Sequence, residues 1–159
     1  MSDEIEPRPI IMKRESEEDR AKMKQQMLER MAAAQQLSQR NETLFLNAWK
    51  RGVQLAGEEY FYAKTPSFSA EKVEPEKSIE AVTDKNQLCP DQDMIEKCIG
   101  GLSGGKRRFL AAMCSIYNSE WGADLMDNCD ARGLANLTAN LDGEHRQVIA
   151  DLIVSYQGW

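Results

Sequence analysis

The sequence predicts an all-α protein, with a long N-terminal helix, an irregular acidic linker and a small C-terminal helical bundle of about five short helices. Apolar residues recur at steps of three and four, the spacing of one helix face. No segment alternates with period two for long enough to predict a strand. Candidate caps and glycines divide residues 89–159 into short helices with connections of about two to four residues, as in a compact bundle.

The charge balance narrows the class of protein. The 159 residues include 20 Lys and Arg against 26 Asp and Glu, which gives a formal net charge of −6 at pH 7. This balance argues against unspecific binding of nucleic acid, because such binding depends on cations that neutralise phosphates. No apolar run approaches the ~20 residues of a membrane helix, and the acidic N-terminus lacks a signal-peptide core. We therefore expect a cytoplasmic protein without a membrane partner.

The N-terminal third is predicted to be a tail followed by one helix. Residues 1–15 are charged and show no helical period, which is typical of a flexible tail. Residues 16–63 contain no Pro and have three carboxylates directly after Ser16, where the positive end of a helix dipole favours them.

We interpret residues 16–63 as an amphipathic helix for oligomerisation or docking. Its apolar stripe is thin, and such a helix depends on a partner surface: another copy, the C-terminal domain or another protein. The alternative is a solvated helix that lies on its own domain. The predicted interface residues are Met23, Met27, Met31, Leu37, Phe45 and Trp49.

The rest of the chain is predicted to be a linker and a domain. Residues 64–88 contain two prolines and alternating Glu and Lys, which predicts mostly irregular chain. Residues 89–159 form the predicted helical bundle domain, because their apolar pattern is denser. The first helix is expected to open with Pro90 in its first turn, together with Asp91 and Asp93, and the residues expected to cap the next four are Ser103, Ser119, Asp130 and Asp142.

One short run suggests a chemistry. Leu102-Ser103-Gly104-Gly105 resembles the signature motif of ABC-type ATPases, in which such a turn opens a helix and binds nucleotide phosphates across a dimer. In that family the motif works together with a phosphate loop of the form G-x-x-x-x-G-K-[ST] and an α/β scaffold. The sequence contains neither that loop nor a strand pattern. We therefore interpret the run as a helix start capped by Ser103 and predict no enzymatic activity.

A basic patch follows this turn. Three consecutive cations occupy the first turn of the predicted helix, where the dipole disfavours them, and this local conflict favours a functional surface. Free amides at a helix start also bind anions. The expected ligand is a phosphate, a nucleic-acid backbone or an acidic protein surface, and the alternative is ordinary solvated charge. The predicted partner- or anion-binding residues are Ser103, Lys106, Arg107, Arg108 and Arg132.

Catalytic and metal-binding patterns are missing from the sequence. His145 is the single histidine, and it lies on the apolar side of the last predicted helix. The four cysteines contain no C-x-x-C pair, so we predict no metal site, no cofactor and no catalytic residue. The expected function is a non-enzymatic interaction or regulatory module that assembles through its N-terminal helix and presents a helical domain to a partner. The alternative is a nucleic-acid-associated accessory protein that uses the basic patch.

Overall fold

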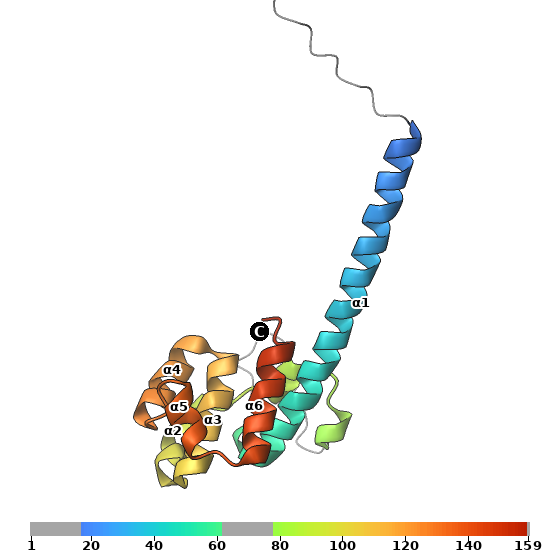
Figure 1. Ribbon diagram of the computed structural model, residues 1–159. Coiled ribbons are helices and arrows are strands. Elements are labelled where there is room, and N and C mark those ends of the chain that lie inside the picture. Colours follow the sequence, from blue (N-terminus) through green and yellow to red (C-terminus); the bar gives the residue numbers. More distant parts are fainter. Residues whose placement is uncertain (1–16, 62–77, 159) are drawn as a thin grey trace, which may run out of the picture. The chain divides into compact units, whose positions relative to one another are not determined.

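The computed structural model describes residues 17–61 and 78–158 and confirms the all-α class (Figure 1). Within these two ranges the chain forms six α-helices, several short 3-10 turns and no strand. The tail predicted for residues 1–15 and most of the predicted linker lie outside the described residues.

Helix α1 spans Glu17–Ala56 and carries three carboxylates in its first turn, as the sequence predicts. The chain divides into two compact units, Met1–Leu37 and Ser38–Trp159, so α1 contributes its two halves to different units. Every described residue from Glu17 to Leu37 is exposed. In the second half, six residues are buried: Phe45, Ala48, Trp49, Gly52, Val53 and Ala56.

The compact unit therefore begins at Ser38, whereas the sequence predicts a domain that begins at residue 89. The reason is an aromatic cluster that the second half of α1 shares with later segments. The Trp49 and Phe61 rings meet edge to face with their centroids 5.7 Å apart, and both side chains are fully buried. The indole Nε1 of Trp49 donates to the Leu88 carbonyl at 3.0 Å, which satisfies its only polar group inside the core. Ile79 is buried too, so the end of the predicted linker belongs to the domain.

The predicted number of five short helices after the linker is confirmed. They are α2 (Gln92–Cys98), α3 (Gly104–Tyr117), α4 (Ser119–Asn128), α5 (Leu134–Ala139) and α6 (Gly143–Ser155).

Two of the five helix starts, those of α3 and α6, fall where the sequence places them, and α2 begins after Asp91, so Pro90 lies before the helix rather than in its first turn. The Asp91 side chain accepts from the Met94 amide at 3.0 Å, and the Asp142 side chain accepts from the His145 amide at 3.0 Å. Ser103 occupies the N-cap position of α3, but its side chain makes no capping hydrogen bond.

The other two starts are shifted. Helix α4 is capped by Asn118, one residue before the predicted Ser119, because the side-chain Oδ1 of Asn118 accepts from two backbone amides of the first turn. Helix α5 begins after Gly133 rather than after Asp130. Both residues have a positive φ (80° and 53°), so the chain turns twice before the helix starts.

Helix α3 supplies much of the core of the compact unit. Phe109, Leu110, Met113 and Cys114 of α3 are fully buried. Helix α4 crosses α3 at Gly122, where a Cβ atom would lie 2.1 Å from the Ser115 Cα atom. This crossing brings two backbones together and accepts only glycine at that position.

Candidate functional site

The first candidate surface is the exposed apolar stripe of α1, which we define as Met23, Met27, Met31 and Leu37. These side chains are exposed by 60%, 63%, 57% and 58%, respectively. Leu28, which the sequence analysis did not single out, is exposed by 54% beside them. The structure thus leaves the stripe uncovered within the described residues, as a partner-dependent helix requires.

The opposite face of the same half-helix is polar and paired with itself. Lys22 forms an ion pair with Glu18 at 2.7 Å, and the Gln25 amide donates to Glu29 at 2.9 Å. Glu18 precedes Met27 by nine residues, or two and a half helical turns, which places it on the far side of the helix from the stripe. The half-helix is therefore amphipathic: polar side chains on one side pair with one another, and the apolar side is exposed.

Phe45 and Trp49, predicted as part of the same interface, are instead core residues. Phe45 stacks on Trp49 with centroids 6.1 Å apart and also meets the Tyr156 ring at 5.9 Å. Trp49 has no exposed surface. The second half of α1 therefore packs against the C-terminal domain, one of the partners considered for this helix. It is unavailable to another molecule.

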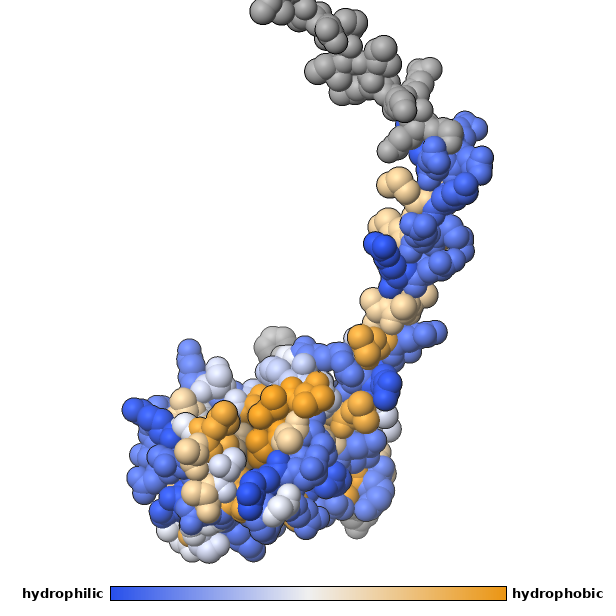
Figure 2. All heavy atoms as spheres, in the orientation of Figure 1, coloured by the Kyte–Doolittle hydropathy of each residue, from blue (hydrophilic) through white to orange (hydrophobic). Residues whose placement is uncertain are grey.

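A second apolar surface, absent from the sequence predictions, lies over the end of α6 (Figure 2). Ile153, Val154 and Tyr156 are exposed by 59%, 83% and 48%. Beside them runs a groove of about 280 Å³, which we call the α3–α6 groove. Its lining residues are Ser115, Ile116, Ser119, Leu152, Ile153 and Tyr156. The signal for this surface was present in the sequence, because the last helix carries more large apolar residues than one face can bury.

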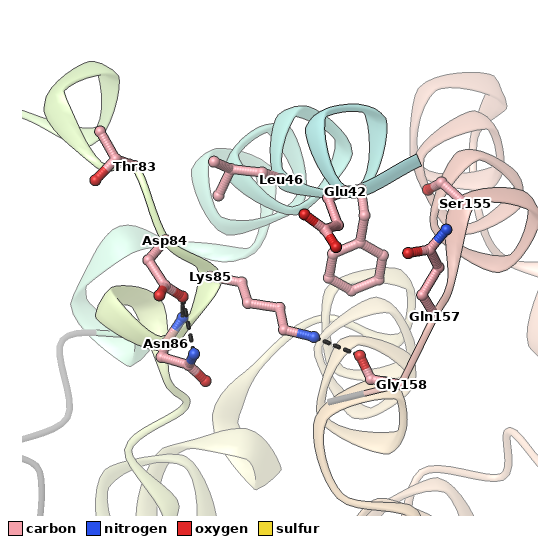
Figure 3. A pocket seen from close by; sticks show the side chains of 10 residues that line it. Glu42, Leu46, Thr83, Asp84, Lys85, Asn86, Ser155, Gln157 and Gly158 are labelled. Carbon is pink, nitrogen blue, oxygen red and sulfur yellow. Dashed lines mark hydrogen bonds between the residues drawn. The ribbon is translucent and has the colours of Figure 1, made fainter. Parts of the chain in front are cut away.

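A pocket of about 360 Å³ lies elsewhere in the compact unit (Figure 3). Its Lys85 side chain crosses the pocket toward the C-terminal segment and donates to the Gly158 carbonyl. The Lys85 ammonium also lies 5.3 Å from the centre of the Phe45 ring. These contacts occupy the one cation of the pocket with the chain's own groups, which fits a role in fastening the C-terminal segment.

The predicted basic patch is partly assembled, and two of its four cations face carboxylates of the domain itself. Arg107 lies 3.9 Å from Asp130, and Arg108 Nε donates to the Cys129 carbonyl at 3.1 Å. Arg132 forms an ion pair with Asp127, which lowers the pKa of that carboxyl. Arg107 and Arg108 thus both contact the turn after α4, at Asp130 and Cys129.

The remaining patch residues, Ser103 and Lys106, are exposed at the start of α3. The second glycine of this turn, Gly105, has a packing reason, because a Cβ atom there would lie 2.8 Å from the Asn140 carbonyl oxygen, whereas a Cβ atom at Gly104 would meet nothing within 4 Å. The start of α3 therefore packs closely against the end of α5 at Gly105. A packing requirement accounts for this glycine without a phosphate ligand.

The contacts of His145 indicate a structural role. Its Nδ1 lies 2.7 Å from the Asp142 carboxylate, and its ring meets the Phe109 ring edge to face at 4.4 Å. Burial raises the pKa of the Cys114 and Cys129 thiols, which disfavours the nucleophilic thiolate form. In the parts of the chain that the structure describes, no three His, Cys, Asp or Glu side chains gather as metal ligands would.

Comparison of the chain with protein-family models, with curated proteins and with solved structures finds no significant match. Over residues 17–61 and 78–158, no helix has the length and apolar character needed to cross a membrane.

Proposed function

We propose that the protein is a non-enzymatic interaction or regulatory module that assembles through the exposed stripe of α1 and presents its helical domain to a partner. The observation that carries this proposal is the stripe itself: four large apolar side chains, each more than half exposed, on a helix whose far side is polar. Burial of one such side chain stabilises a complex by about 1.5–3 kcal/mol before the cost of association. The proposed setting is the cytoplasm, where the four cysteines stay free thiols.

The proposal is tested by the mass of the intact chain in solution, with the double variant Met27→Lys/Met31→Lys for comparison. We expect the wild-type chain to sediment as an oligomer and the double variant to sediment as a monomer, because two charges cannot enter an apolar contact without a large desolvation cost.

The matched control is Ala32→Lys/Gln36→Lys, which adds the same charge to exposed positions on the far side of the helix. This control is expected to keep the wild-type mass. A wild-type monomer at all concentrations, or an oligomer that survives Met27→Lys/Met31→Lys, would contradict assembly through the stripe.

The second candidate function is a nucleic-acid-associated accessory protein. Two observations favour it: Lys106 is exposed at the start of α3, and the Arg132 side chain is 80% exposed. Against it, Arg107 and Arg132 already face Asp130 and Asp127. If phosphate contacts matter, binding to a DNA or RNA duplex weakens steeply with salt and is lost in Lys106→Ala/Arg107→Ala/Arg108→Ala. Binding that does not respond to salt would reject this candidate.

A further inference from the structure

The chain that follows α6 is fastened to α1 by two side-chain contacts. We call residues Tyr156–Gly158 the C-terminal segment. The Tyr156 ring meets the Phe45 ring with centroids 5.9 Å apart, and the Ser38 hydroxyl donates to the Gln157 side-chain oxygen at 3.1 Å. Tyr156 and Gln157 are both exposed. Contacts of this kind open at a lower free-energy cost than those of the buried core.

A third contact crosses the pocket drawn in Figure 3. The Lys85 side chain reaches over from the opposite side of this pocket and donates to the Gly158 carbonyl. The same ammonium lies 5.3 Å from the centre of the Phe45 ring. A volume of about 360 Å³ remains open between the two sides. The C-terminal segment therefore borders this space without filling it.

The wall of the pocket opposite the C-terminal segment is fixed by other contacts. The Asp84 side chain accepts from the Asn86 amide at 2.8 Å and caps the turn that carries Lys85. The buried hydrogen bond from Trp49 to the Leu88 carbonyl, at 3.0 Å, ties the same turn to α1. Neither hydrogen bond involves the C-terminal segment. Release of that segment therefore leaves a preformed site on α1 and the turn.

The contacts of the C-terminal segment indicate which ligand suits this site. The chain is extended at Tyr156, whose ring lies against Phe45, and a main-chain carbonyl two residues later accepts from Lys85. Glu42 and Asp84 also line the pocket, and their carboxylates disfavour an anionic ligand. A neutral peptide carbonyl avoids that repulsion. The matching ligand is an extended peptide with an aromatic residue two positions before the carbonyl that accepts from Lys85.

We propose that a peptide segment of a partner protein binds this site in place of the C-terminal segment, which blocks the site as an intramolecular competitor. Because the C-terminal segment is tethered, its effective concentration at the site is of the order of millimolar. The affinity for the partner peptide is therefore reduced by the fraction of molecules in which the site is open. This inference goes beyond the proposed function, since it does not require assembly through the α1 stripe.

The test is an NMR titration of the full chain with the acetylated and amidated peptide Ser-Tyr-Gln-Gly, which copies residues 155–158. The opened variant is Tyr156→Ala/Gln157→Ala, which removes two contacts of the C-terminal segment and leaves the opposite wall intact. We expect its Kd for the peptide to be lower than the wild-type Kd by about tenfold or more, because more molecules have an open site. The matched control is Val154→Ala, because Val154 is 83% exposed and does not line the pocket. This control is expected to bind the peptide like the wild type.

A second pair of substitutions tests the role of Lys85. Added to the opened variant, Lys85→Met should raise the Kd for the peptide by about tenfold or more, because the peptide carbonyl loses a charged donor. The matched control is Lys50→Met, since Lys50 also donates to a main-chain carbonyl, that of Glu80 at 3.1 Å, but does not line the pocket. This control should leave the Kd unchanged. Circular dichroism should show the same helix content for all variants.

Three results would overturn the inference. Equal binding to the wild type and to the opened variant would show that the C-terminal segment does not compete with the peptide. Binding that Lys85→Met leaves unchanged would place the peptide on another surface. A peptide that does not bind the opened variant would show that the pocket is not a peptide site. The mass of the chain in solution is measured separately, so each of these results leaves the proposed function standing.

Discussion

The two halves of α1 have similar apolar spacing but opposite surroundings. Met23, Met27 and Met31 repeat at four-residue steps and are exposed, whereas Phe45, Trp49 and Val53 repeat at the same steps and are buried. The difference lies in the side chains and in what meets them. The second half carries rings and a β-branched residue, and later segments of the chain cover it. The comparison teaches that a helical stripe predicts which side of a helix is apolar but not what covers that side.

The largest expected effect tests whether the second half of α1 belongs to the core. Trp49→Ala should lower the free energy of unfolding by about 3–5 kcal/mol, because it leaves a cavity and removes the partner of the Leu88 carbonyl. The control Met31→Ala should change it by less than about 0.5 kcal/mol, since that side chain is exposed. Urea unfolding followed by circular dichroism measures both. Similar losses of unfolding free energy for the two variants would contradict the difference between the two halves of α1.

A smaller effect is expected at Gly52, where a Cβ atom would lie 2.4 Å from the terminal methyl of Met113. That methyl ends a flexible side chain and can move, so Gly52→Ala should cost about 1 kcal/mol after the gain in helix propensity. At Gly122 the obstacle is the Ser115 backbone, so Gly122→Ala should cost about 3 kcal/mol. Thermal unfolding compares the two variants, and a Gly52→Ala variant less stable than Gly122→Ala would be unexpected.

A still smaller effect is expected where α1 meets α6 through charge. Arg51 pairs with Asp151 at 3.1 Å, and both side chains remain more than one-third exposed. Pairs of this kind contribute about 0.2–1 kcal/mol, so Arg51→Ala should lower stability by no more than that. A double-mutant cycle with Asp151→Ala isolates the pair, and a coupling above about 2 kcal/mol would show that charge, rather than apolar packing, holds this half of α1.

The smallest effect is a pH dependence of the domain. Hydrogen bonds from the His145 amide and ring hold the pKa of Asp142 below its ordinary value of about 3.8. A depressed folded-state pKa contributes stability above the unfolded value, and this stability is lost as the pH falls through the folded value. Asp142→Asn should therefore flatten the decline in stability below about pH 4. Melting temperatures between pH 5 and pH 2 measure this, and an unchanged decline would contradict the assignment.

The sequence predicts helix starts well where the signal is a local side chain, as at Asp142. It is less accurate where two candidates compete, since Asn118 precedes Ser119 and both suit an N-cap. The turn before α3 shows a further limit. Its helix start was predictable, but the reason for Gly105 is a carbonyl 35 residues later in the chain.

The candidate surfaces follow the same division. The α1 stripe was predictable because its four-residue period is contained in one segment. The α3–α6 groove was not, because its lining comes from the end of α3, the start of α4 and the end of α6. The contact between Arg107 and Asp130 was not predictable either, because it depends on the turn after α4.

The sequence by itself determined the helical class, the five short helices and the amphipathic character of α1, because helical period, caps and glycines act over a few residues. Only the tertiary structure decided which half of α1 is covered and where the domain begins. Trp49 is buried because Phe61 and the Leu88 carbonyl meet it, and Phe45 because Tyr156 does. Burial depends on contacts between distant segments, and a local pattern shows only that a residue is suited to burial, not which residue will cover it.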